Sequence, residues 1–432
     1  MKFASLTNRT RARGQEVLVS RQRGPLSYLP FLGPAIIASI AYMDPGNFAT
    51  NIQGGAEFGY MLLWVVLVAN LIAMLFQSLS AKLGIVTNKS LAEHCRDHFP
   101  LPVVYCMWIA SEIAAMATDL AEVLGGAIGL TLLFHVPLIV SCLITGIVTY
   151  GILLVQGSGF RPMEIVIGAF VSAISLSYVA EIFIAPPNWA AAAYGTFVPH
   201  LAGSGSITLA VGIVGATVMP HAVYLHSSLM KDRIPMRDDA DKKRVLRFSN
   251  HEVLMALGVA GLVNMAMLTM SAVVFYFTGH QSVTDIETAY RTLTPLLGSG
   301  AAGIFLISLL ASGFSSSVVG TMAGQTIMQD FVRFRIPLWL RRLITIVPAL
   351  IVIALGVDTT QALIVSQVIL SLILPIPIIA LLIFTARRDI MGDFVNSRLV
   401  TSTAIIASVV VLTLNVLLLV RLANIPLPFI GS

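Results

Sequence analysis

The chain has little charge, and this excludes an ordinary soluble domain. Only 11% of its 432 residues are Asp, Glu, Lys or Arg, against roughly 25% in typical soluble domains. Because 57% of the residues are hydrophobic, the chain is predicted to be an all-α integral membrane protein. Apolar segments continue from about residue 29 to 422 without a gap of soluble-domain size. We therefore expect one transmembrane domain over residues 1–432.

Cysteines and catalytic motifs are also scarce. The three cysteines, Cys95, Cys106 and Cys142, show no C-x-x-C spacing, so neither a disulfide framework nor a zinc site is indicated. The sequence lacks H-E-x-x-H, and no nucleophile and base stand at a workable spacing, which argues against a membrane-embedded hydrolase. The net charge of +5 is explained by Lys and Arg in the loops. We expect no enzyme activity, no cofactor, no nucleic-acid binding and no obligatory protein partner. The lipid bilayer is the expected surrounding of the chain.

The distribution of Lys and Arg predicts the orientation. Residues 1–28 are basic and lack the apolar core and cleavage site of a secretory signal, so we expect them to stay in the cytoplasm. At about 20 residues per crossing, we expect eleven membrane spans. Their centres are near residues 43, 72, 116, 145, 173, 217, 265, 311, 349, 372 and 410. Only Arg291 and Arg421 then fall clearly outside, as the positive-inside rule favours. An odd number of spans places the C-terminus outside.

The spans divide into two halves, each of which opens with an interrupted helix. Residues 29–186 hold spans one to five, residues 207–386 hold spans six to ten, and residues 398–422 form span eleven. Because five is odd, the halves have opposite orientations. Helix-breaking residues interrupt the first span at 41–47 and the sixth at 216–221. Paired interruptions in inverted repeats indicate a substrate site at the membrane midplane. We interpret the polar stretch 231–250 as an exposed linker between the halves.

The two interruptions carry side chains that bind metal ions. Asp44 places a carboxylate near the bilayer centre, where a charge costs about 2.5–3.5 kcal/mol. Asn47 adds an amide oxygen, while Pro45 and Gly46 prevent a regular helical turn and leave backbone carbonyls free. Met219 adds a soft thioether, which Mg²⁺ and Ca²⁺ do not use. This mixed set favours a first-row divalent transition-metal ion.

Each of these residues has a structural alternative when taken alone. Asp-Pro-Gly-Asn is commonly a surface turn, Met219 fits a hydrophobic core, and His221 fits a satisfied interior histidine. Their joint occurrence at the start of both halves favours the binding site.

A stripe of acids in span three predicts a proton path. Glu112, Asp119 and Glu122 are separated by seven and three residues, so they share one helical face. Three carboxylates on one face should point into the bundle, where ionisable groups form proton relays. Arg341 and Arg342 in span nine would pair with them; the alternative is that these arginines mark the cytoplasmic end of the span. A purely structural ion-pair network is also open.

Histidine has a reference pKa near neutral pH, and although a divalent cation nearby would oppose its protonation, we expect His221 to tune the field at this site. We hypothesise that an arriving metal ion displaces a proton from Asp44 toward Glu122 and Asp119. Residues expected to gate or line the path are Pro45, Gly46, Pro220, His226 and Asn264.

The motifs resemble those of a known family. Asp44-Pro-Gly-Asn47 and Met219-Pro-His221, with Ala117-Thr-Asp119-Leu-Ala-Glu122 and Ser366-Gln367-Val368, are similar to signatures of the Nramp family of proton-coupled divalent metal transporters. The resemblance extends from about residue 30 to 385. It implies the LeuT-like fold, a 5+5 inverted repeat in which helices 1 and 6 are broken. Magnesium-transporting relatives lack the Met, so Met219 argues against that branch.

The resemblance also implies the ligands and the function. By correspondence of motifs, the metal ligands are Asp44, Asn47, Met219 and the carbonyl of Ala216, joined in some conformations by the carbonyl of Ala41 and the side chain of Gln367. A short basic N-terminus and eleven spans resemble bacterial manganese importers of the inner membrane. We expect Mn²⁺, and also Fe²⁺, to be imported with protons by alternating access.

Two other transport functions fit the composition. A sodium-coupled amino-acid symporter would share the architecture, but neither the acid at Asp44 nor the thioether at Met219 suits an anionic substrate. A passive metal channel is harder to exclude, because selectivity rings also use carboxylates.

Overall fold

The computed structural model describes residues 2–20, 24–231, 233–281, 283 and 285–422, and every regular element in this part of the chain is helical. The predicted position of the C-terminus outside the membrane concerns residues 423–432, which lie outside the described residues. Arg21 and Arg23 of the basic N-terminal segment also lie outside them.

Eight segments of the described chain are long and apolar enough to cross a membrane. They are α4 (Leu63–Thr87), α6 (Leu101–Phe134), α8 (Phe160–Ile184), α10 with α11 (Gly203–Thr217 and Pro220–Met230), α12 (Asp239–Ser271), α14 (Ser299–Val332), α16 with α17 (Thr359–Ile373 and Pro375–Ala386) and α19 (Arg398–Leu422). A π-helical turn, η4 (Ala272–Tyr276), extends α12.

Shorter helices occupy the three remaining predicted spans. They are the interrupted run α2 (Pro34–Ile40), η2 (Ala41–Met43) and α3 (Pro45–Phe58), then α7 (Leu138–Leu153) and α15 (Leu338–Ala354). All eleven predicted span centres except residue 43, which falls in η2, lie in α-helices. The division into repeats at 29–186 and 207–386 stays a prediction, although each range contains an interrupted helix near its start.

Several short helices connect the spans. They are α1 (Lys2–Ser20), η1 (Pro25–Tyr28), α5 (Leu91–His98), η3 (Leu154–Ser158), α9 (Trp189–Phe197), α13 (Ile286–Leu297), α18 (Arg388–Met391) and η5 (Gly392–Phe394). α5 begins with a capping box, in which Ser90 and Glu93 each bind the other's backbone N–H. This arrangement satisfies two donors that a helix start leaves unpaired.

The stretch 231–250 differs from the exposed linker that the sequence suggested. It lies within the second half, and only its first part is a connector, between α11 and α12, because α12 begins at Asp239. The Asp238 carboxylate accepts a hydrogen bond from the backbone N–H of Asp241 at 2.8 Å and so caps this helix. The charged residues from Asp239 onward were predicted to be part of the linker, but they form the first three turns of α12.

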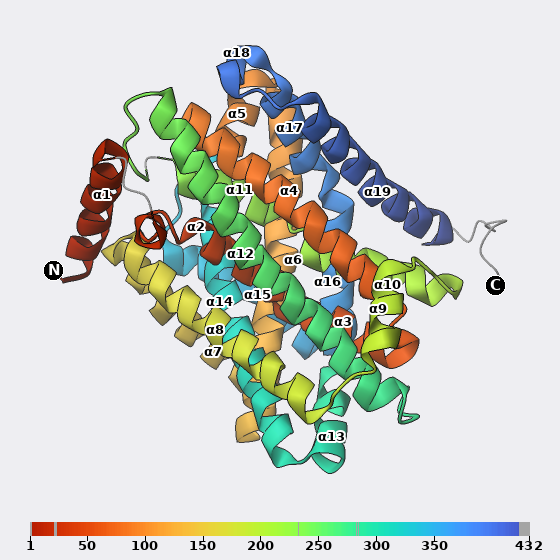
Figure 1. Cartoon of the computed structure of the whole chain (residues 1–432). Coiled ribbons are helices and arrows are strands. Elements are labelled where there is room, and N and C mark those ends of the chain that lie inside the picture. The colour runs from red at the N-terminus through yellow and green to blue at the C-terminus, as the bar shows by residue number, and fades with distance from the viewer. Residues whose placement is uncertain (1, 21–23, 232, 282, 284, 423–432) are drawn as a thin grey trace.

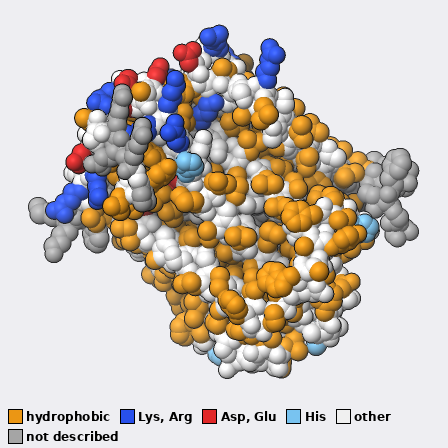
Figure 2. All heavy atoms as spheres, viewed as in Figure 1, with side chains coloured by type: hydrophobic (Ala, Val, Ile, Leu, Met, Phe, Trp, Pro, Cys, Tyr) orange, Lys and Arg blue, Asp and Glu red, His pale blue; other side chains and the backbone are white. Residues whose placement is uncertain are grey.

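Small residues allow the central helices to approach closely. A Cβ placed on Gly313 of α14 would lie 2.6 Å from the backbone nitrogen of Gly126 in α6, so the absence of a side chain at Gly313 lets the two helices pack closely. Figure 1 shows α8 and α12 running side by side, with α1 at one end of the pair. Figure 2 shows Lys and Arg gathered at that end, above a broad hydrophobic surface.

Candidate functional site

The first interruption lies where the sequence predicts it. α2 ends at Ile40, one 3₁₀ turn follows, and Asp44 adopts an extended conformation with φ −78° and ψ 169°. Pro45 then begins α3, since its missing N–H is harmless at a first helical position. The Asp44 carboxylate caps α3 by accepting a hydrogen bond from the backbone N–H of Asn47 at 2.8 Å. Its other oxygen, Oδ2, is buried without a protein hydrogen-bond partner.

The second interruption has the same form. α10 ends at Thr217, Val218 and Met219 are non-helical, and Pro220 begins α11. Met219 is fully buried in the hydrophobic core. The last carbonyls of a helix have no partner within the helix, so this break leaves the Ala216 carbonyl available to a neighbour.

The two breaks meet through Asn47. With its amide nitrogen as donor, Asn47 lies 2.6 Å from Asp44 Oδ1 and 3.1 Å from the carbonyl oxygen of Ala216. Gln367 of α16 closes the same place, because its amide lies directly over Gly46, where a Cβ would overlap it. The Gln367 Oε1 atom is buried without a protein partner. Helices α3, α10 and α16 pack against one another around this point.

Four predicted ligand positions, Asp44, Asn47, Ala216 and Gln367, are therefore brought together. The other two, Ala41 and Met219, lie on the same interruptions, each three residues from one of these four, and both are buried. The described residues contain no group of three or more His, Cys, Asp or Glu side chains arranged to hold a metal ion. The predicted ligand set therefore consists of amide, carbonyl and thioether groups with a single carboxylate.

The acids of α6 continue from this point. A Cβ on Gly125 would overlap the Pro45 ring, so this part of α6 touches the first break. Glu122 is three residues earlier on the same helical face, and Gly320 of α14 lies against its carboxylate. Both carboxylate oxygens of Glu122 and of Asp119 are buried without a protein hydrogen-bond partner. A row of under-satisfied acids thus leads away from Asp44 inside the bundle.

The arginines of α15 face these acids and are buried. Arg342 Nη1 lies 3.7 Å from Asp119 Oδ1, and Arg342 also donates to Ser317 Oγ at 2.5 Å. Arg341 forms an ion pair with Glu112 at 2.9 Å. Both guanidinium groups are buried among the helices and lie beside acids of α6, as the predicted pairing requires.

The predicted lining residues also contact the breaks. His221 Nδ1 lies 3.2 Å from Thr118 Oγ1, and its Nε2 has no protein partner. Asn264 donates to the backbone carbonyl of Tyr42 at 2.7 Å. His226 Nδ1 lies 2.7 Å from Gln77 Oε1.

Three polar residues of this network, Tyr42, Asn51 and Gln77, are absent from the predicted set of site residues. Gln77 donates to the Tyr42 hydroxyl at 2.5 Å, and so links the first break to His226. Asn51 donates to Asn264 at 3.0 Å. The available signal was a polar side chain inside an apolar span, since such residues usually face the bundle interior.

The arrangement is that of a transporter rather than an enzyme, because two broken helices surround a buried polar site in a membrane bundle. The Nramp family, described as natural resistance-associated macrophage protein-like, matches residues 35–421. The chain belongs to this family, so the predicted family is confirmed. Nramp structures share the LeuT fold, and the predicted fold class is confirmed as well.

Relatives of known name cover nearly the whole chain. The divalent metal cation transporter MntH of Granulibacter bethesdensis is 58% identical over 425 residues, covering 98% of this chain and 96% of the relative. That of Acidiphilium cryptum is 60% identical over 402 residues, covering 93% of each. A crystal structure of the Eremococcus coleocola manganese transporter superposes with a TM-score of 0.83 at 34% identity, covering 93% of this chain and 88% of that chain.

Proposed function

We propose that the chain imports divalent transition-metal ions, Mn²⁺ and also Fe²⁺, together with protons. Transport proceeds by alternating access across a bacterial inner membrane, with the N-terminus in the cytoplasm and the C-terminus outside. One observation carries the proposal: Asp44, Asn47, the Ala216 carbonyl and Gln367 converge at two broken helices, while Asp44 Oδ2 and Gln367 Oε1 remain without protein partners.

The unpaired oxygens favour a cationic substrate. A buried carboxylate oxygen without a donor is costly, and a metal ion or a proton removes that cost. Oxygen donors alone would also accept Mg²⁺ or Ca²⁺, which are abundant hard cations. The buried thioether of Met219, on the second break, adds a donor that suits transition metals. The names of the relatives, which specify divalent metal cations and manganese, support the same substrate class.

The row of acids supports proton coupling. The row begins with Asp44 at the first break. Glu122 and then Asp119 follow along α6, and Asp119 faces Arg342. A divalent ion at Asp44 stabilises the ionised carboxylate, so the proton moves toward Glu122 and Asp119. The membrane potential then drives the inward movement of positive charge with about 2.3 kcal/mol per elementary charge per 100 mV.

Replacement of Met219 by Ala tests the choice of metal. We expect the ratio of Mn²⁺ to Ca²⁺ uptake in proteoliposomes to fall by about tenfold, the equivalent of 1.4 kcal/mol, because the remaining donors are oxygens. Met163→Ala is the matched control, since Met163 is a buried methionine of α8 away from both breaks. Unchanged selectivity in Met219→Ala would remove the basis for the soft-ligand argument.

Replacement of Asp119 by Asn tests proton coupling. Metal-driven acidification of the vesicle interior should decrease in Asp119→Asn, and also in Asp44→Asn. Asp330→Asn is the control, because Asp330 is a buried acid of α14 that accepts a hydrogen bond from Ser90 at 2.6 Å instead. Undiminished proton flux in both site variants would reject this path. Currents far above carrier turnover would indicate the passive channel.

A further inference from the structure

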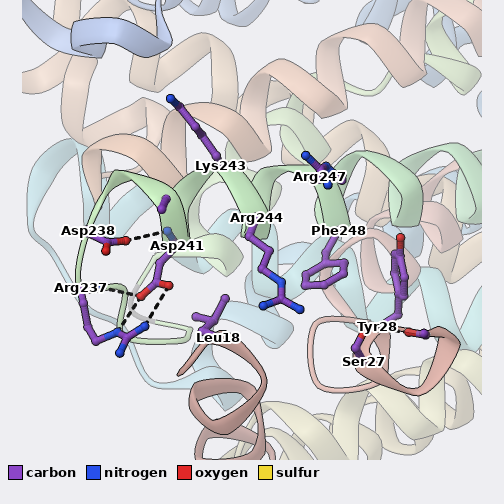
Figure 3. A pocket seen from close by; sticks show the side chains of 12 residues that line it. Leu18, Ser27, Tyr28, Arg237, Asp238, Asp241, Lys243, Arg244, Arg247 and Phe248 are labelled. Atoms are coloured by element: carbon purple, nitrogen blue, oxygen red, sulfur yellow. Dashed lines mark hydrogen bonds and ion pairs between the residues drawn. The ribbon is translucent and has the colours of Figure 1, made fainter. Parts of the chain in front are cut away.

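A cavity of about 540 Å³ lies outside the transport site, between the end of α1, η1 and the first turns of α12. Figure 3 shows the Arg244 side chain pointing between Leu18 and Phe248, with Tyr28 beside Phe248. Lys243 extends from the other side of the helix. The cavity therefore has a guanidinium group beside the apolar side chains of Leu18 and Phe248, within a mostly polar lining.

Contacts hold Arg244 in this position. Its Nη1 donates to the carbonyl oxygen of Val17 at 2.9 Å, and its guanidinium carbon lies 5.5 Å from the centre of the Phe248 ring. Phe248 in turn packs edge-on against Tyr28, with ring centroids 4.5 Å apart. A guanidinium oriented in this way presents several donors in one plane, which suits the oxygens of a phosphate group.

Positive charge is in excess around the cavity. The carboxylate of Asp241 is neutralised by Arg237, which donates to its two oxygens at 2.9 and 3.2 Å, and Asp238 is engaged in capping α12. Lys243 and Arg247 also line the cavity and are exposed. Neither forms an ion pair with a carboxylate of the described residues. The cavity thus attracts an anion.

A separate apolar groove lies further along α12, beyond the basic cavity. Phe248, Glu252, Met255 and Val259 are spaced by four, three and four residues, so they lie on one face of the helix. Glu252, Met255 and Val259 line a second cavity of about 630 Å³ between α12, α8 and α2. The Oε1 atom of Glu252 accepts the backbone N–H of Ala35 at 3.1 Å, and among the described residues its Oε2 atom has no hydrogen-bond partner.

The groove runs further between α8 and α12. A third cavity of about 670 Å³ shares Ser175 and Val259 with the second. Met255, Leu262 and Leu176 are exposed along this surface. In a membrane protein, such exposed apolar grooves face the lipid hydrocarbon. The basic cavity therefore lies at the level of the lipid headgroups, and the groove lies at the adjoining level of the hydrocarbon chains.

We propose that the basic cavity and the groove form one site for an anionic phospholipid. The phosphodiester lies at Arg244 and Arg247, and an acyl chain follows the groove past Met255 and Val259. Phe248 and Met255 are seven residues apart, roughly 10 Å along a helix, which is comparable with the roughly 5–8 Å depth of one headgroup region. A small free anion would use the basic cavity alone, whereas an apolar groove on the same helix, next to a basic cavity, favours a lipid.

Lipid binding to the full-length purified protein tests the proposal. Phosphatidylglycerol should be retained in native mass spectrometry and should raise the thermal midpoint more than phosphatidylcholine does. Arg247→Gln should weaken phosphatidylglycerol binding by about fivefold, the effect expected for one basic residue near a membrane surface. Arg244→Gln should do the same, and Arg244→Lys should restore part of the loss. Arg335→Gln, an exposed cation on the loop after α14, is the matched control and should bind normally.

A groove variant separates a lipid from a small anion. Val259→Trp fills the groove and should weaken phosphatidylglycerol binding while the basic cavity is unchanged. Inorganic phosphate at millimolar concentration should displace little lipid from the unmodified protein. The proposal is overturned if the Arg247→Gln and Arg335→Gln variants retain lipid equally, or if Val259→Trp has no effect and phosphate competes fully. Metal transport is not measured, so these outcomes do not depend on the transport proposal.

Discussion

Two buried glutamates in membrane helices, Glu122 and Glu164, have opposite surroundings. Both oxygens of Glu164 are paired, one with Arg161 at 2.9 Å and the other with Arg233. Both oxygens of Glu122 lack a protein hydrogen-bond partner. The two side chains are equally hidden from solvent. Burial therefore does not distinguish the two glutamates, whereas the presence or absence of a partner does.

The paired glutamate belongs to the start of the first span. Arg161 and Arg233 both donate to the carbonyl of Leu32, at 2.8 and 2.9 Å. Gly33 follows with φ 144°, a conformation that favours glycine, and a Cβ there would overlap the Glu164 carboxylate. This region is a closed hydrogen-bonded structure that anchors α2. The region around Asp44 and Glu122 is left incomplete by the protein alone.

The largest expected effect comes from breaking the paired region. Glu164→Gln removes the carboxylate that pairs with both Arg161 and Arg233, so it should lower the free energy of unfolding by about 3–5 kcal/mol. Thermal unfolding in detergent measures this, and metal uptake per folded molecule should be retained. The exposed Glu287–Arg291 pair at 2.5 Å is the control, because exposed pairs contribute little. Equal effects of Glu164→Gln and Glu287→Gln would contradict the structural role.

The next effect is on transport and concerns the incomplete region. Asp44→Asn keeps the side-chain shape but removes the charge, so Mn²⁺ uptake should fall by at least about 100-fold, the upper end for loss of an outer-shell metal contact. The thermal midpoint should not fall, because Oδ2 has no protein partner to lose. Radioactive Mn²⁺ uptake and thermal unfolding on the same preparation measure both. Retained Mn²⁺ uptake in Asp44→Asn would contradict the role of Asp44 in transport. A loss of stability like that of Glu164→Gln would show that Asp44 also has a structural role.

The smallest effect concerns His94 in α5, which lies outside the membrane spans. Its hydrogen bonding is intermediate between that of Glu164 and that of Glu122. Its Nε2 lies 2.9 Å from Thr87 Oγ1, whereas its Nδ1 has no protein partner. Burial, with the nearby charges of His98 and Lys89, lowers the pKa of His94 to about 4, against about 6.5 when unfolded. Between these values the unfolded chain binds a proton that the folded chain does not, so stability is lost as pH falls from 6.5 toward 4.

Thermal unfolding at pH 7.5 and pH 5 checks this sign. The unmodified protein should lose about 1 kcal/mol more than His94→Gln does on acidification, after allowance for solvent screening. An identical pH dependence in both proteins would show that His94 is not held neutral in the folded state.

Local chemistry explains what could be predicted. Pro45, Gly46 and Pro220 interrupt helices wherever they stand in an apolar span, so both breaks were found at the correct residues. The seven- and three-residue spacings placed Glu112, Asp119 and Glu122 on one face of a helix. The break at Pro375 between α16 and α17 was not predicted from the sequence.

Partners distant in sequence could not be predicted. Glu164 meets Arg233 and Gln77 meets His226 across intervals of 69 and 149 residues, and no local pattern encodes such pairs. The helical start of α12 was also misread, because charged residues in a helix that extends beyond the membrane look like those of a linker.

The sequence by itself determined the membrane class, the spans and the places where two helices break, since hydropathy and proline act over a few residues. Only the tertiary structure decided which buried charges are satisfied, because a partner is supplied by whichever helix packs alongside. It brought Asn47 to the Ala216 carbonyl and two arginines to Glu164, but no donor to Glu122.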